Sequence, residues 1–135
     1  MAFTIHQKVM FKHCDPAGIV FYPRYFEMIN DTVERFFDER LMVPFESLHI
    51  DGGVPTAQIA TTFKAPSRHG DMLDITLTPR RIGRSSLDLE FSALSAGETR
   101  FTAASTLVYI GADGRPKSWP DTLRDALTRE IGETP

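Results

Sequence analysis

Hydrophobic and polar residues alternate along several segments of the chain, and this period of two indicates strands with one buried face. The first segment covers residues 3–12. In residues 73–78 and 86–93, leucine, isoleucine, phenylalanine or alanine occupies every second position. Residues 56–63 are rich in β-branched side chains, which favour strands. Residues 99–110 become apolar on both faces near their end, which indicates a strand inside a sheet.

A different period appears between Tyr22 and Arg40, where apolar residues recur every three or four positions. This spacing predicts an amphipathic helix of about 19 residues, roughly 28 Å long at 1.5 Å per residue. A shorter helix is predicted to run through Glu130, opened by a capping box of Ser118 and Asp121. The apolar stripe of the long helix is interpreted as core and consists of Tyr22, Tyr25, Phe26, Ile29, Val33, Phe36 and Phe37.

Five strands, one long early helix and short connections predict antiparallel pairing. The expected fold class is α+β, with one curved, five-stranded antiparallel sheet wrapped around one long central helix. A chain of 135 residues suits one domain, so residues 1–135 are expected to form a single unit. No internal repeat, linker or low-complexity segment interrupts this pattern.

Composition narrows the classes of partner. Fifteen Lys and Arg against 18 Asp and Glu give a net charge of −3, which argues against nucleic acid. The single cysteine excludes an internal disulfide, and the first residues lack the pattern of a signal peptide, so a cytoplasmic location is expected. No apolar run approaches the roughly 20 residues that a membrane span requires.

Residues 13–26 combine a turn, a carboxylate and a helix start. The Asp-Pro-x-Gly sequence at Asp15 favours a chain reversal, and Pro23 suits the first turn of a helix, where its missing N–H is not needed. Free N–H groups near Tyr22, with the positive end of the helix dipole, can stabilise developing negative charge. Asp15 is thus a candidate catalytic carboxylate, although an aspartate in such a turn can also serve only to hydrogen-bond its own backbone.

Asp-Pro-Ala-Gly-Ile-Val at residues 15–20, followed by Tyr22-Pro23, resembles the signature of the 4-hydroxybenzoyl-CoA thioesterase branch of the hotdog-fold thioesterases. The resemblance is strong over residues 9–40 and continues in register to about residue 110. Related hotdog thioesterases carry His where this chain has Pro23, so this departure itself indicates the hydroxybenzoyl-type branch. The resemblance implies a hotdog fold whose subunits form at least a homodimer, with a homotetramer expected.

By the same resemblance, Asp15 is the catalytic group, acting on a thioester carbonyl as nucleophile or as general base for water. The backbone N–H of Tyr22 then polarises that carbonyl. Thiolate is a good leaving group, so one carboxylate and one helix terminus can suffice. The expected partner is an acyl-CoA substrate.

The turn at residues 80–86 combines arginines, a glycine and hydroxyl groups, which suits the phosphates of coenzyme A. An ordinary solvated hairpin turn would look the same. In the family, a basic residue followed by Ser at this turn contacts coenzyme A, which assigns Arg84 and Ser85 to CoA binding. Arg81 in this turn and Arg68 in another turn are further candidates for CoA binding.

Other chemistry finds little support. No Gly-x-Ser-x-Gly, His-Glu-x-x-His or Walker-type sequence is present, which argues against serine hydrolases, zincins and nucleotide triphosphatases. Cys14 adjoins Asp15 but has no evident His-Asp relay. No set of histidines, cysteines or carboxylates has metal-site spacing, so neither a metal nor a cofactor is predicted.

The sequence therefore predicts an acyl-CoA thioesterase that releases coenzyme A and an aromatic, 4-hydroxybenzoyl-like or other compact acid. Two alternatives belong to other classes. One is a non-catalytic protein that binds acyl-CoA or an acyl carrier. The other is a hotdog dehydratase, which would need a histidine on the long helix, and residues 22–40 contain none.

Overall fold

The computed structural model describes residues 2–132 and contains a five-stranded antiparallel sheet in the order β1-β4-β5-β6-β3. The predicted sheet is thus confirmed, and the strand expected inside it, β6, lies between β5 and β3. The bounds are Phe3–Lys8 for β1, Thr56–Phe63 for β3, Met72–Ile82 for β4, Ser86–Ser95 for β5 and Glu98–Val108 for β6.

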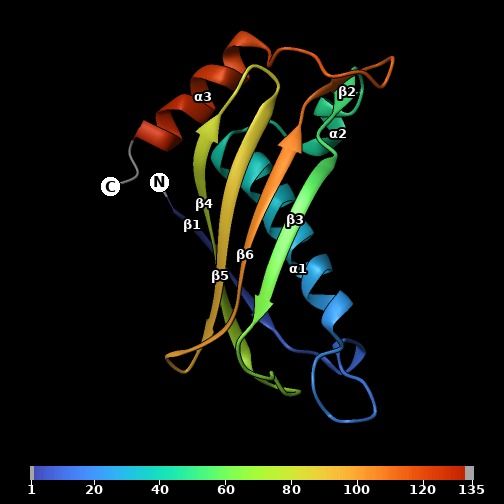
Figure 1. Ribbon diagram of the computed structural model, residues 1–135, viewed down its shortest axis with the longest axis vertical. Helices are drawn as coiled ribbons and strands as arrows, with labels where there is room; N and C mark the ends of the chain where they lie inside the picture. Colours follow the sequence, from blue (N-terminus) through green and yellow to red (C-terminus); the bar gives the residue numbers. More distant parts are fainter. Residues whose placement is uncertain (1, 133–135) are drawn as a thin grey trace.

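The long helix crosses one face of this sheet (Figure 1). It consists of α1, Tyr22–Arg35, and a π-helical turn, η2, Phe36–Arg40, so the predicted range is confirmed at both ends. The last turn is wider than expected because the Leu41 N–H donates to the Phe36 carbonyl, five residues back, at 3.1 Å. The other helices are α2, Phe45–Leu48, and α3, Asp121–Gly132.

The core lies between α1 and the facing side of the sheet. Five of the seven residues predicted for the apolar stripe are buried, whereas Tyr22 is 56% exposed and Phe26 is only partly covered. These two residues flank Phe63 at the end of β3 instead, with ring centroids 5.9 Å and 6.4 Å from it. The largest fully buried side chains are Phe36, Phe37, Phe101, Ile5, Met28, Leu73, Ile75, Leu77, Leu87, Leu89, Leu107 and Leu127.

The first strand is shorter than residues 3–12, because β1 ends at Lys8 and Phe11–His13 form a 3-10 turn, η1. The backbone N–H of Met10 donates to His13 Nδ1 at 2.9 Å instead of to a neighbouring strand. Continued alternation would place Phe11 on the same face as the buried Phe3 and Ile5, but Phe11 is 81% exposed. Alternation alone could not predict this turn, because the side chain that accepts the Met10 N–H is that of His13, three residues later.

Two further segments differ from the expectation. Residues 52–53, where a Gly-Gly pair favours a loop, form β2, Gly52–Gly53, which pairs with β7, Ile110–Gly111. A Cβ on Gly52 would lie 2.4 Å from the Ile110 carbonyl oxygen, so only glycine fits there. The capping box at Ser118 is wrong, because α3 begins after Pro120, whose carbonyl accepts the Arg124 N–H at 2.8 Å.

The sheet has two distinct ends (Figure 1). One end, called the cleft end, holds the last residues of β1 and β3, the first residues of β4, the β5–β6 hairpin and the loop that leads into α1. At the other, called the α3 end, the β4–β5 turn lies beside α3. Within residues 2–132, no helix is long and apolar enough to cross a bilayer.

Candidate active site

The loop before α1 is a small hairpin with Asp15 near its tip. The Gly18 N–H donates to the Asp15 carbonyl at 2.9 Å, and Gly18 has a φ of +81°, which glycine adopts readily. Below this turn, the Asp15 N–H donates to the Ile19 carbonyl and the Phe21 N–H donates to the His13 carbonyl. The predicted reversal is thus present, and its two arms are held together.

The Asp15 carboxylate does form the local bond that a turn aspartate often makes. Its Oδ1 accepts the Ala17 N–H at 2.9 Å, and no other group among residues 2–132 donates to it. The carboxylate nevertheless has capacity for more donors. Asp15 is partly buried and lines a cavity of about 540 Å³, together with Ile19, Val20, Phe21, Tyr22, Tyr25, Phe63, Lys64, Ala65 and Pro66.

The start of α1 opens onto the same cavity. Tyr22 is the first helical residue, Pro23 the second, and Phe21 precedes them in an extended conformation. No acceptor in residues 2–132 takes the Tyr22 N–H, because a first-turn donor has no partner within its own helix. Asp15 and the first residue of α1, at the positive end of the helix, therefore line one cavity.

The walls of this cavity are mainly aromatic and aliphatic. Phe63 lies against Tyr22 and stacks on Tyr25, with centroids 5.8 Å apart and planes 25° apart. The cation in the lining is Lys64, directly after β3. Sequence reasoning missed Lys64, because a single lysine at a strand end carries no pattern. Such a cavity suits an apolar or aromatic group beside a polar reaction centre.

His13 supports the hairpin from below. It is 6% exposed, and its Nδ1 accepts the Met10 N–H, so the ring is neutral with its proton on Nε2. Burial, followed by the charge of Lys12, lowers the pKa of His13 below its ordinary value of 6.5. Arg24 also lowers this pKa, whereas the carboxylates of Glu27 and Asp31 raise it.

This geometry predicts acid sensitivity. Protonation puts a hydrogen on Nδ1 and breaks the bond from Met10, so the fold favours neutral His13. Its contribution is complete above pH 6.5 and is lost as the pH falls from there through the lowered pKa. We expect the melting temperature of the wild type to fall between pH 7.5 and 5 more than that of His13→Gln, whose amide oxygen accepts the same bond without titrating. Parallel curves would contradict this role.

The CoA-binding candidates do not gather at this cavity within one chain. Arg81, Arg84 and Ser85 lie at the α3 end, roughly 30 Å away, since the 11 residues of β4 rise about 3.3 Å each. Arg124 donates to the Arg84 carbonyl at 2.9 Å, which fixes the turn and leaves the Arg84 side chain exposed. Arg68 does lie at the cleft end, paired with Ile19 of the Asp15 hairpin.

The rest of the site holds no evident metal centre. Across residues 2–132, no three His, Cys, Asp or Glu side chains form a group that could hold a metal ion. The Cys14 sulfur lies 3.8 Å from the Met10 carbonyl oxygen. Among the residues that line the cavity, Asp15 supplies a carboxylate and Tyr22 is the first residue of α1.

Comparison with known proteins now identifies the family. The sequence model that describes the thioesterase-like superfamily matches residues 9–127 of this chain. The chain belongs to the thioesterase-like superfamily. Membership of this family makes the chain a thioester hydrolase, and its sheet and central helix are those of the hotdog fold.

Among relatives of this thioesterase-family protein are two hydrolases of aromatic CoA esters. The 1,4-dihydroxy-2-naphthoyl-CoA hydrolase of Nostoc punctiforme is 25% identical over 126 residues, which cover 91% of this chain and 84% of that enzyme. The 4-hydroxybenzoyl-CoA thioesterase of a Pseudomonas species is 26% identical over 77 residues, and the match spans only 55% of either protein.

Two solved structures resemble this chain over most of its length. The gentisyl-coenzyme A thioesterase BH1999 superposes with a TM-score of 0.85 at 27% identity, over 93% of this chain and 99% of that one. The protein SAV2348 of Staphylococcus aureus, solved in complex with CoA, superposes with a TM-score of 0.93 at 18% identity, over 100% of this chain and 87% of that one. The latter likeness shows the fold alone.

Proposed function

We propose that this protein hydrolyses an aromatic or other compact acyl-CoA at the Asp15 cavity, releasing the free acid and coenzyme A. One observation carries the proposal: Asp15 and Tyr22, whose N–H has no acceptor in residues 2–132, line the same mainly apolar cavity. The names of the relatives, which act on hydroxybenzoyl, dihydroxynaphthoyl and gentisyl thioesters, support an aromatic acyl group.

The chemistry follows two routes that the site supports equally. In both, the thioester oxygen accepts the Tyr22 N–H, which stabilises negative charge as the carbonyl carbon becomes tetrahedral. In one route Asp15 attacks this carbon, expels the CoA thiolate and forms an anhydride that water then hydrolyses. In the other, Asp15 takes a proton from water while that water attacks. Each route consumes one water and yields one acid and one thiol.

A thiol-release assay across benzoyl, 4-hydroxybenzoyl, phenylacetyl and short aliphatic CoA esters tests the proposal. Hydrolysis of the aromatic esters, with the highest kcat/KM among them, is the expected result. A binding protein would titrate with these esters and release no thiol. A dehydratase would consume hydroxyacyl or enoyl esters without releasing thiol, and either result would overturn the proposal.

The edge of the sheet suggests how the chains assemble. Strand β3 is an edge strand without proline or charged residues, and its Ile59 and Phe63 are 37% and 46% exposed. Proteins usually protect such an edge. We propose that β3 pairs with β3 of a second copy in at least a homodimer, in which residues 1–135 act as one domain. Light scattering of the purified protein measures the mass directly, and a monomer would contradict this.

A second copy also gives the α3 end a role. Because Arg84 is remote from Asp15 of its own chain, it can contact bound CoA at that cavity only from another chain of the assembly. We propose this role for Arg84 and Ser85, with Arg81 beside them and Arg68 contributed at the cleft end.

Arg84→Ala should raise KM for acyl-CoA about tenfold with little change in kcat, because it removes a contact to the nucleotide far from the reacting carbon. The matching N-acetylcysteamine thioester, which lacks the nucleotide, should show the same KM with wild type and variant. Arg129→Ala on the exposed side of α3 is the control. An unchanged KM for acyl-CoA would place the nucleotide elsewhere.

A further inference from the structure

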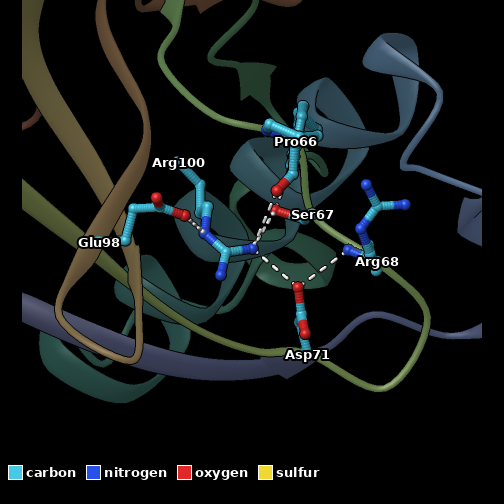
Figure 2. A network of polar contacts seen from close by, with 7 residues as sticks. Pro66, Ser67, Arg68, Asp71, Glu98 and Arg100 are labelled. Carbon is cyan, nitrogen blue, oxygen red and sulfur yellow. Dashed lines mark hydrogen bonds and ion pairs between the residues drawn. The ribbon is translucent and has the colours of Figure 1, made fainter.

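Arg100 is a buried arginine at the start of β6, at the cleft end of the sheet, and is 8% exposed. Figure 2 shows its guanidinium between Glu98 and the β3–β4 connection. Nη1 lies 2.7 Å from Asp71 Oδ2, 3.1 Å from the Pro66 carbonyl and 3.2 Å from Ser67 Oγ. Nε lies 2.9 Å from Glu98 Oε1, in an ion pair too bent for a hydrogen bond. The Arg100 side chain thus links Glu98 of β6 to the β3–β4 connection, residues 64–71, which includes Asp71.

The residues that Arg100 holds belong to the wall of the Asp15 cavity. Its carbonyl accepts the N–H groups of Lys64 and Ala65 at 2.8 Å and 3.2 Å. The Tyr25 hydroxyl donates to Ser67 Oγ at 2.8 Å, and Ser67 is fully buried. Lys64, Ala65 and Tyr25 all line the cavity. Arg100 therefore fixes one wall of the cavity through both its backbone carbonyl and its side chain.

The same connection also holds the Asp15 hairpin. The Val20 N–H donates to the Ser67 carbonyl at 2.9 Å, and Ile19 pairs with Arg68. Ile19 in turn accepts the Asp15 N–H at 3.0 Å. A continuous series of hydrogen bonds runs from Arg100 through the β3–β4 connection to the loop that carries the carboxylate.

We propose that Arg100 is a positioning residue for the Asp15 cavity: it holds the β3–β4 connection in the one arrangement that sets Asp15 opposite the start of α1. This inference rests on the proposed function of that cavity. An apolar side chain of similar size would serve core stability as well, since a buried charge has a large desolvation cost. What a guanidinium adds is a rigid set of donors that fixes several acceptors in one geometry.

The neighbouring carboxylate is suited to this role. The Arg68 backbone N–H, followed by the Arg100 guanidinium, lowers the pKa of Asp71. Asp71 Oδ2 accepts from both, at 2.9 Å and 2.7 Å. Asp71 therefore stays ionised at neutral pH and keeps the connection bound to Arg100.

The test compares Arg100→Met and Arg100→Lys with Arg40→Met. Arg40 is also a partly buried cation, paired with Glu130 at 3.2 Å, but it contacts α3 and not the cavity. With assays well below each melting temperature, Arg100→Met should lower kcat about tenfold and change KM less than about twofold. Arg100→Lys should recover part of kcat, because it keeps the positive charge and hydrogen-bond donors on one nitrogen. Arg40→Met should lower the melting temperature without changing kcat.

Amide hydrogen exchange supplies a readout that does not depend on activity. In Arg100→Met, exchange of the Val20 N–H should accelerate at least about tenfold, because its acceptor Ser67 is no longer fixed. The Tyr109 N–H, bonded to the Ser85 carbonyl at the α3 end, should not change. Unchanged Val20 exchange and kcat would overturn the role of Arg100. Full activity in Asp15→Asn would instead overturn the proposed function, whatever Arg100 does.

Discussion

Asp15→Asn is expected to lower kcat for the preferred acyl-CoA by about 10³-fold, equivalent to about 4 kcal/mol in activation free energy. Asparagine can neither attack the carbonyl as an anion nor accept a proton from water. Its amide oxygen still accepts the Ala17 N–H, so the turn and the fold should persist. Steady-state kinetics and the melting temperature of the variant measure the two effects separately.

Asp113 provides a matched control for this change. Its Oδ1 accepts the Arg115 N–H at 3.0 Å, which is the same local bond that Asp15 makes to Ala17. Asp113 lies in an exposed turn before α3 and is absent from the cavity lining. Asp113→Asn should therefore leave kcat unchanged. Near-normal activity of Asp15→Asn on every hydrolysed ester would reduce Asp15 to a turn residue and remove the basis of the proposed mechanism.

The fold could be predicted from the sequence because its main signals are local. Alternation identified β1, β4 and β5, β-branched residues indicated β3, and apolar residues on both faces indicated β6. A spacing of three and four located the helix from Tyr22 to Arg40. The errors came where one side chain or a distant strand overrides the pattern. His13 ends the first strand by accepting the Met10 N–H, and Gly52 joins β7 from more than fifty residues away.

The site was predictable in part for the same reason. Asp15 and Tyr22 are close in sequence and belong to one signature, so their placement in one cavity could be expected. Arg84 lies at the opposite end of β4 from that cavity, which no turn composition can indicate. Lys64 and Arg100 reach the site through the pairing of β3 with β6. An arginine next to Phe101 near the start of a predicted strand was the one available signal for Arg100, and it is weak.

Tyr22→Pro is expected to lower kcat about 10²- to 10³-fold relative to Tyr22→Ala, because it removes a single backbone N–H. The change is structurally mild. Tyr22 is the first residue of α1, where proline is well tolerated, and Phe21 before it has φ −71° and ψ 122°, which a following proline permits. No acceptor in residues 2–132 loses a bond, since none takes this N–H.

Tyr22→Ala separates the N–H from the ring. Both variants lose the contacts of the ring with Phe63 and Phe26, whereas only the proline variant loses the donor. The two should therefore melt at similar temperatures and bind an inert acyl-CoA thioether with similar affinity, since a thioether without a carbonyl at sulfur does not use the N–H. A kcat for Tyr22→Pro equal to that of Tyr22→Ala would show that the charge developing on the thioester oxygen is stabilised elsewhere. A loss confined to the proline variant would assign that stabilisation to the first N–H of α1. Both variants lack the tyrosine ring and keep the helix, and only the proline variant also lacks this donor.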